Sequence, residues 1–398
     1  MTSALLAERV QRLQPSPTLA VTARAAELKA QGRDIIGLGA GEPDFDTPEH
    51  IKEAAIRAIR AGQTKYTAVG GTPTLKRAVI EKFRRENGLD YKADQILVSC
   101  GGKQSFFNLC QALLNPGDEV VIPAPYWVSY PEIVALAGAI PVMPYAGPEQ
   151  HYKLQPEQLE RAITRRTRLL MINSPSNPTG MAYSRAELEA FGAVLRRHPQ
   201  VFIATDDMYE HCQWRGGPFS NIVMACPDLY ARTLVLSGVS KTYAMTGWRI
   251  GYAGGPAWLI NSMTDVQSQS TSNPASMSQA AAEAALTGDQ SCVSRMCRAY
   301  EERHAFVYQQ LHSMPGVRVL PADGTFYVFP DLSAVIARLK LADDNALAER
   351  LLNDAGIAVV AGTAFGAPGH LRLSFATSMQ NLEAAMARLH DFLHAAGV

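Results

Sequence analysis

A lysine in an uncharged setting is the first residue of this sequence that could do chemistry. Lys241 follows Ser240 shortly after the apolar run 233–236, and the residues around it carry no charge until Arg249. A lysine in a desolvated loop at the carboxyl end of a parallel strand can lose its proton and form a Schiff base with a carbonyl compound. Most lysines are only surface charges, so this hypothesis needs support from other residues.

Two glycines ahead of a predicted helix could bind an anion. In the segment 99–103 (SCGGK) an apolar run ends and a helical pattern begins. The free N–H groups of a helix start can hold a phosphate, and Gly101 and Gly102 would let it approach closely. Arg249 could add a guanidinium fork. Taken alone, the same segment is also typical of an ordinary turn between a strand and a helix.

Other polar and aromatic residues follow predicted strands. Asp206 could cap a helix, bind a metal or hold a protonated pyridine nitrogen, and Tyr209 lies three residues further on. Asn177 belongs to a Pro/Asn/Gly loop at 173–180. Trp127 could stack on a flat ligand or lie in the core. The glycine cluster at 37–42 (GLGAGE) does not fit a dinucleotide fingerprint, because a glutamate takes the place of the last glycine.

Strands that alternate with helices must position these residues. Such alternation predicts an α/β fold with a mostly parallel sheet, whose ligands bind at the carboxyl ends of the strands. Ser184 and Glu187 form a capping box that predicts a helix start. The predicted strands are 96–100, 120–122, 168–173, 201–205, 233–236 and 250–253, and other helices are predicted over 106–114 and 130–137.

The pattern changes after about residue 290. A long helix over 289–314 is followed by short strands and helices, which predict a smaller α+β domain. We therefore expect an arm and entry strand at 1–45, a large α/β domain at 46–290 and a small domain at 291–398. In the small domain, strands are predicted at 317–320, 326–329, 357–360 and 371–375, and helices at 345–355 and from about residue 379.

Composition excludes several functions. The 398 residues include 37 basic and 37 acidic ones, so nothing favours binding to nucleic acid or to an anionic membrane. No apolar run is long enough for a transmembrane helix or a signal peptide, so a cytoplasmic protein is expected. The six cysteines are scattered, which favours neither disulfides nor a zinc site.

Taken together, segments from residue 39 to residue 378 resemble one enzyme family. The chain is similar to the fold type I, pyridoxal-phosphate-dependent aminotransferases of class I, and more closely to the bacterial aspartate aminotransferases. The matching segments are GAGEPDFDTPEH (39–50), KYTAVGGTPTLKRAV (65–79), SCGGKQ (99–104), PAPYWVSYPE (123–132), NSPSNPTG (173–180), DDMYEH (206–211), SGVSKTYAMTGWRIGYAGGP (237–256) and LRLSFATS (371–378).

The resemblance implies a role for each matching residue toward the cofactor. Lys241 would form the Schiff base and then move a proton. Asp206 would pair with the pyridine nitrogen, Tyr209 and Asn177 would hydrogen-bond the phenolic oxygen, and Trp127 would stack on the ring. The phosphate would be held by Gly101, Gly102, Ser240 and Arg249, with Lys103 beside it and Tyr66 reaching in from the second subunit of an obligate homodimer.

The resemblance also implies how substrate is held. Arg372 would clamp the α-carboxylate, helped by Asn177, Trp127 and the backbone at Gly41. In the bacterial subgroup the lysine of the GGK motif binds the second carboxylate of aspartate, which nominates Lys103, with Thr18 as a helper. Alternatively, Lys103 would pair only with the phosphate.

The predicted function is therefore amino transfer between aspartate and 2-oxoglutarate by a ping-pong mechanism through Lys241. Aromatic amino acids, or prephenate as amino acceptor, are alternatives, since a lysine on a flexible stem could swing aside for a ring. A regulator that binds the cofactor without catalysis is a further alternative. Related lyases, decarboxylases and synthases share the scaffold.

Overall fold

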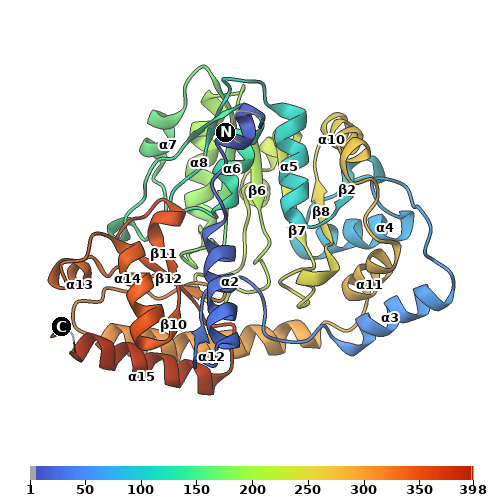
Figure 1. Cartoon of the computed structure of the whole chain (residues 1–398). Coiled ribbons are helices and arrows are strands. Elements are labelled where there is room, and N and C mark those ends of the chain that lie inside the picture. Colours follow the sequence, from blue (N-terminus) through green and yellow to red (C-terminus); the bar gives the residue numbers. More distant parts are fainter. Residues whose placement is uncertain (1–5, 396, 398) are drawn as a thin grey trace.

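A seven-stranded sheet lies at the centre of the structure, a computed structural model that describes residues 6–395 and 397 (Figure 1). Its strand order is β2-β8-β7-β6-β5-β3-β4, and all neighbours are parallel except for β8, which runs antiparallel to β2 and β7. The predicted mostly parallel α/β sheet is thus confirmed. The strands are β2 (Ile96–Ser99), β3 (Glu119–Val121), β4 (Ile140–Val142), β5 (Thr167–Asn173), β6 (Phe202–Asp206), β7 (Thr233–Gly238) and β8 (Gly251–Gly254).

Helices cover both faces of this sheet, which explains its apolar strands. Successive side chains of a strand point to opposite faces. Along β5, Leu169 and Met171 enter the core under one helix layer, whereas Leu170 and Ile172 enter the core under the other. The first layer contains α5 (Gly102–Leu113), α6 (Ser129–Leu136) and α10 (Ala257–Ser270); the second contains α3 (Glu49–Arg60), α4 (Pro73–Lys82), α8 (Arg185–Arg197) and α11 (Ser276–Thr287).

The start of α8 confirms the predicted capping box. The hydroxyl of Ser184 accepts a hydrogen bond from the Glu187 N–H at 3.3 Å, and the Glu187 carboxylate accepts one from the Ser184 N–H at 2.7 Å. These two bonds satisfy donors that a helix start would otherwise leave free.

The C-terminal elements form two small sheets beside the long helix α12 (Ser291–Ser313). One sheet has the order β11-β12-β9 and is antiparallel, whereas β1 and β10 form a parallel pair. Helix α2 packs on β10 and β11 and lies in front of them in Figure 1. These elements are α2 (Pro17–Ala30), β1 (Ile36–Gly37), β9 (Tyr327–Val328), β10 (Ile357–Ala358), β11 (Val360–Ala361), β12 (Leu371–Ser374) and α15 (Met379–Ala395).

Shorter helices and turns complete the chain. The remaining α-helices are α1 (Glu8–Gln11), α7 (Pro156–Ala162), α9 (Ile222–Ala225), α13 (Ser333–Arg338) and α14 (Asp344–Arg350). Single turns of other helix types are η2 (Phe83–Asn87), η3 (Ala93–Gln95), η4 (Pro148–Gln150), η5 (Pro227–Arg232), η6 (Thr246–Trp248), η7 (Leu351–Ala355) and η8 (Gly362–Phe365). None of the helices within residues 6–395 is long and apolar enough to cross a membrane.

Of the strands predicted in the C-terminal part, one is wrong and one is divided. Segment 317–320 makes only an isolated bridge, between Arg318 and Asp331, because Pro321 and Pro330 beside it lack the N–H that a longer ladder needs. The predicted strand 357–360 is divided at Val359, and its two halves, β10 and β11, pair in different sheets.

The N-terminal arm also differs from the prediction, because residues 17–30 form helix α2. This helix buries only Ala25 and Leu28, so its sequence lacks a clear apolar face. The edge strand β4 was not predicted either. Pro141 lies at its centre, and a proline is tolerated in a strand at the sheet edge but not within it.

Candidate active site

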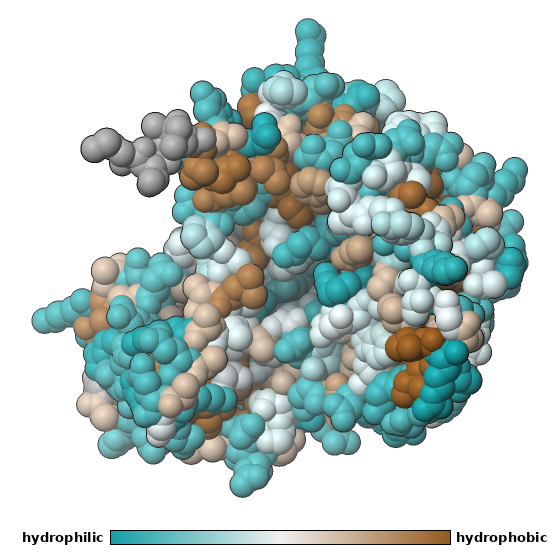
Figure 2. All heavy atoms as spheres, turned by 45° about the vertical axis from the view of Figure 1, so that its right-hand side comes forward, coloured by the Kyte–Doolittle hydropathy of each residue, from teal (hydrophilic) through white to brown (hydrophobic). Residues whose placement is uncertain are grey.

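A cavity of about 420 Å³ lies at the carboxyl ends of β5, β6 and β7. The face of the molecule shown in Figure 2 is hollowed near its centre. The residues around the cavity come from nearly the whole chain, from Ser16 on the arm to Arg372 on β12. Twelve residues of the predicted site line it: Thr18, Gly41, Gly102, Lys103, Trp127, Asn177, Asp206, Tyr209, Ser240, Lys241, Arg249 and Arg372.

Two residues of the predicted site do not line the cavity. Gly101 precedes α5 and is the neighbour in sequence of Gly102, which does line the cavity. Tyr66 is 92% exposed and is not among the residues that line the cavity. The chain thus brings together by itself every predicted group except the one that was expected to come from a second subunit.

Lys241 projects into the cavity from the loop that follows β7. Its amine donates a hydrogen bond of 2.5 Å to the backbone oxygen of Gly41. Burial lowers the pKa of Lys241 to about 8, and the positive charges of Arg372 and Arg249 act in the same direction, against the carboxylate of Glu42. A substantial fraction of this amine is therefore neutral near pH 8, as a nucleophile or base requires.

Asp206 ends β6, with its carboxylate beside the cavity. One oxygen, Oδ2, accepts a hydrogen bond of 2.6 Å from the Tyr130 hydroxyl, and Oδ1 accepts one of 3.1 Å from the Met208 N–H. Burial raises the pKa of Asp206, although these hydrogen bonds oppose the shift. No described ion pair includes this carboxylate, so a cationic ring nitrogen would be a suitable partner.

Arg372 is the largest fully buried side chain near the cavity. Its guanidinium donates to the Asn177 side-chain oxygen at 3.0 Å and to the Gly39 backbone oxygen at 2.7 Å, while Nε has no partner. Its Cζ atom lies 4.4 Å from the ring centre of Tyr327. Within the described residues no carboxylate pairs with Arg372, so its charge is available to an anion.

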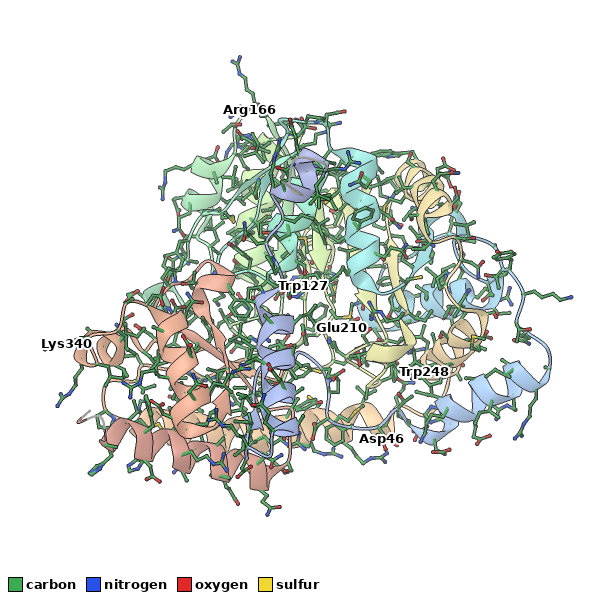
Figure 3. The ribbon with its side chains drawn as sticks, in the orientation of Figure 1. Asp46, Trp127, Arg166, Glu210, Trp248 and Lys340 are labelled. Carbon is green, nitrogen blue, oxygen red and sulfur yellow. The ribbon has the colours of Figure 1, made fainter. Side chains whose placement is uncertain are left out.

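Tyr209 and Trp127 supply the aromatic wall. The Tyr209 hydroxyl is hydrogen-bonded to that of Tyr327 at 3.1 Å, and burial raises its pKa well above the usual value, so it stays protonated. Trp127 lies near the centre of the molecule, between α2 and α5 (Figure 3). The Lys103 amine lies 5.0 Å from the centre of the Trp127 ring.

The start of α5 forms an anion cradle. Gly101 has a φ of +89°, and a Cβ there would lie 2.5 Å from Nη2 of Arg249. A Cβ at Gly102 would lie 2.6 Å from Cε of Met208. The two glycines therefore keep open the space where N–H groups and a guanidinium converge, and burial together with Arg249 lowers the pKa of the neighbouring Lys103.

Several residues of the site were not predicted from the sequence. Tyr130, Tyr327 and the Gly39 carbonyl hold Asp206, Tyr209 and Arg372 in place, yet they belong to patterns that indicate core helices, strands and turns. Glu42, the residue that does not fit a dinucleotide fingerprint, lines the cavity, and its negative charge acts to raise the pKa of Lys241. For Tyr130, the single hint in the sequence is that it follows Trp127 by three residues.

Comparison with known proteins identifies the family. Residues 33–389 match the family described as aminotransferase class I and II. The chain belongs to this family. It is 59% identical to the aspartate/prephenate aminotransferase of Nitrosomonas europaea, over 98% of this chain and 99% of the relative.

Solved structures give the same result. The aspartate aminotransferase from Rhizobium meliloti superposes with a TM-score of 0.93 at 46% identity, over 98% of both chains. The aspartate aminotransferase from Thermus thermophilus with maleate superposes with a TM-score of 0.92 at 45% identity, over 97% of this chain and 99% of the other. These matches confirm the fold type I architecture.

The aminotransferases of this family depend on pyridoxal phosphate, and the cavity fits that group. The cradle at Gly101 and Gly102 suits a phosphate, the unpaired carboxylate of Asp206 suits a pyridinium nitrogen, and the amine of Lys241 suits an aldehyde. The cavity thus offers complementary chemistry to each polar part of the cofactor.

The lowered pKa of Lys241 makes stability depend on pH. Between about 8 and 10.5 the unfolded chain holds a proton on this lysine and the folded, cofactor-free protein does not. The free energy of unfolding should therefore rise with pH across this interval relative to that of Lys241→Met. Urea unfolding of both cofactor-free proteins at pH 8 and pH 10 measures the difference, and parallel pH profiles would contradict it.

Proposed function

We propose that the chain transfers the amino group of aspartate to a 2-oxo acid such as 2-oxoglutarate, by a ping-pong sequence of two half-reactions in one cavity. The observation that supports it best is the meeting of Lys241, with its lowered pKa, and the buried, unpaired Arg372 in the same space. The first offers a base and a point of attachment, and the second offers a site for an α-carboxylate.

In this proposal eight residues hold the cofactor by its ring and phosphate. Asp206 pairs with the ring nitrogen, Tyr209 and Asn177 donate to the phenolic oxygen, and Trp127 stacks on the ring. The phosphate lies at the cradle of Gly101, Gly102, Ser240 and Arg249. When bound, the cofactor stabilises the negative charge that develops at Cα of the amino acid as its proton leaves.

Lys241 acts first as the point of attachment and then as the base. Once the substrate amine had displaced it from the cofactor, the Lys241 amine would be free to take the proton from Cα of the amino acid and to donate a proton to the cofactor carbon that had carried the aldehyde. Burial, together with the positive charges of Arg372 and Arg249, lowers the pKa of this amine. The base is also tethered beside the reacting atoms, which removes the cost of bringing it there.

Two basic residues would bind the two carboxylates of aspartate. Arg372 holds the α-carboxylate with help from Asn177, Trp127 and the backbone at Gly41. Lys103 holds the second carboxylate from its position over the Trp127 ring. Thr18, which lines the cavity and whose buried hydroxyl has no hydrogen-bond partner in the structure, would assist it.

The role of Lys103 can be tested by substitution. Lys103→Ser should raise the Michaelis constant for aspartate at least about tenfold, because the second carboxylate loses its cation, while that for phenylalanine should stay within about twofold. Steady-state kinetics with both donors measure this split, with Lys153→Ser as a control outside the cavity. Equal losses for the two donors would assign Lys103 to the phosphate instead.

Prephenate is a second candidate acceptor. The relative from Nitrosomonas europaea carries aspartate/prephenate aminotransferase as its name. Prephenate has a second carboxylate, which Lys103 could bind, and its ring would meet the apolar lining at Leu19 and Val128. Competition between prephenate and 2-oxoglutarate for the same amino-loaded protein would decide between the two acceptors.

An absorbance titration tests the main proposal. Addition of aspartate or glutamate to the cofactor-loaded protein should lower the band of the lysine-bound cofactor and raise that of its amino form. Conversion mainly by phenylalanine or tyrosine would point to an aromatic aminotransferase. Absence of any cofactor band after addition of pyridoxal phosphate would overturn the proposal, and would support neither an aspartate nor an aromatic aminotransferase.

We also propose that two copies of the chain share their sites. The exposed Tyr66 would reach the phosphate of a neighbouring copy. Subunits carrying Tyr66→Phe and Lys241→Ala, refolded together, should then form hybrids with one intact site and regain activity at limiting cofactor. Light scattering would give the mass of the assembly. A monomer, or mixtures no more active than the separate variants, would contradict shared sites.

A further inference from the structure

The ring of Tyr130 contacts two of the groups that face the cofactor cavity. Tyr130 belongs to the first turn of α6 and is only 2% exposed. Its hydroxyl donates to Asp206 at 2.6 Å, while its ring meets that of Trp127 edge-on, with centres 5.1 Å apart and an angle of 83°. One side chain therefore supports both a carboxylate and an aromatic ring of the site.

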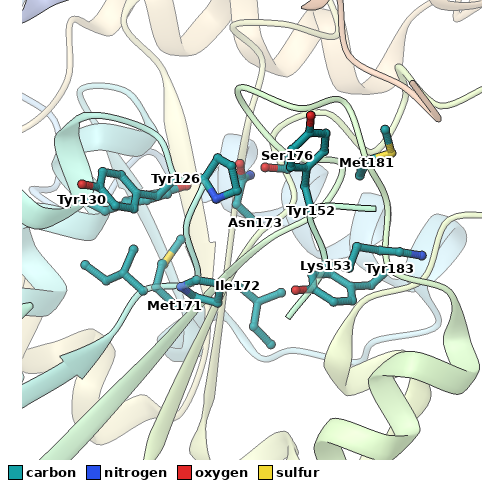
Figure 4. Close-up of a pocket in the computed structure, with 13 residues that line it drawn as sticks. Tyr126, Tyr130, Tyr152, Lys153, Met171, Ile172, Asn173, Ser176, Met181 and Tyr183 are labelled. Carbon is teal, nitrogen blue, oxygen red and sulfur yellow. The ribbon is translucent and has the colours of Figure 1, made fainter. Parts of the chain in front are cut away.

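The position of Tyr130 is itself fixed from several sides. Its ring packs edge-on against Phe106 at 5.2 Å, and its N–H donates to the Trp127 carbonyl at 3.0 Å. Beyond the ring lies a second, much smaller cavity of about 20 Å³, at whose wall Tyr130 and Asn173 appear in Figure 4. That volume holds about one water molecule, so the ring has little room to move on this side.

The hydroxyl of Tyr130 determines which part of Asp206 faces the cavity. Since Met208 N–H binds Oδ1 and Tyr130 binds Oδ2, the carboxylate has a donor on each oxygen and a fixed plane. Burial raises the pKa of Tyr130 well above its usual value, so the hydroxyl remains a donor. A donor to a carboxylate stabilises its charged form, which is the form that attracts a cationic nitrogen.

We propose that Tyr130 is a positioning residue that holds Asp206, oriented and charged, against the ring nitrogen of pyridoxal phosphate. The inference rests on the proposed function, in which Asp206 is the partner of that nitrogen. Loss of the hydroxyl leaves one oxygen of a buried carboxylate without its donor, and the attraction to the nitrogen is weakened. The phosphate and aldehyde contacts are unaffected.

Tyr130→Phe tests this role, because it removes only the hydroxyl. The cofactor-free variant should bind pyridoxal phosphate roughly tenfold more weakly than the wild-type protein, as measured by fluorescence titration. With the 1-deaza analogue, in which carbon replaces the ring nitrogen, the two proteins should differ by less than about twofold. A displaced cavity wall would weaken the binding of both ligands equally. Equal losses of affinity for the two ligands, or no loss for either, would therefore overturn the inference.

Controls separate this inference from the proposed function. Tyr183→Phe removes another buried hydroxyl, which accepts the Leu154 N–H at 2.8 Å, and should leave both affinities unchanged. Asp206→Asn should weaken binding of pyridoxal phosphate, and adding Tyr130→Phe to it should cause little further loss. If Asp206→Asn binds normally, the proposed function fails; if only Tyr130→Phe binds normally, the inference alone fails.

A second variant is needed if Tyr130→Phe does not fold. Tyr130→His keeps a hydrogen-bond donor and should therefore retain the preference for the ligand with a ring nitrogen. Loss of that preference would count against the inference.

Discussion

Lys241→Ala should abolish amino transfer while leaving a folded protein that still binds pyridoxal phosphate noncovalently. The variant loses both the point of attachment and the base, and a positioned base alone contributes about 10²–10⁴-fold to the rate. The phosphate cradle and Asp206 do not depend on this amine. Activity with aspartate, together with the absorbance of the bound cofactor, measures the two effects separately.

Lys340→Ala is a suitable control for this experiment. Lys340 is exposed, does not line the cavity and points away from the molecule at its left edge in Figure 3. Its replacement should change neither rate nor absorbance. Near-normal turnover in Lys241→Ala would refute the assignment of this lysine, whatever the cofactor did.

Arg372→Lys should lower kcat/KM for aspartate by about 10²–10³-fold, since truncating one member of a buried charge pair commonly costs 2–5 kcal/mol. Lysine keeps the charge but loses the planar fork that two carboxylate oxygens require. It also leaves the Gly39 carbonyl and the Asn177 oxygen without their donors. Steady-state kinetics and the affinity of the cofactor-free protein for pyridoxal phosphate should be measured together.

The expected pattern is a large kinetic loss with cofactor affinity nearly unchanged. Arg318→Lys is the matched control, because Arg318 is largely exposed and pairs only with the exposed Glu149. If Arg372→Lys weakened the binding of the cofactor as strongly as it lowered kcat/KM for aspartate, Arg372 would belong to the cofactor site. The proposed α-carboxylate clamp would then be wrong.

Much of the fold could be predicted because local signals agreed with the final packing. The strands of the central sheet are apolar on both faces, so they appear as continuous apolar runs, and the capping box of Ser184 marks a helix start. Segment 317–320 (VRVL) has an alternating apolar pattern, but Pro330 beside its partner Asp331 lacks the N–H that would extend the pairing. Pairing of a strand depends on residues elsewhere in the chain, which the pattern does not contain.

The candidate site, too, could be predicted from the sequence only in part. Lys241 and Asp206 could be proposed because they follow strands, where α/β sheets place their ligands. The groups that orient them could not, because the Gly39 carbonyl and the Tyr130 hydroxyl become recognisable only through their contacts. The contact between Gly39 and Arg372 joins residues 333 positions apart, a distance over which no periodicity carries information.

That same contact has a consequence for synthesis. The arm, β1 and β12 meet only when the last part of the chain is present, because β1 pairs with β10 and Arg372 reaches back to Gly39. A nascent chain that still lacks β12 can build most of the central sheet as it emerges from the ribosome, yet it has no complete cavity. The clamp for the substrate α-carboxylate is therefore completed later in synthesis than the residues that hold the cofactor.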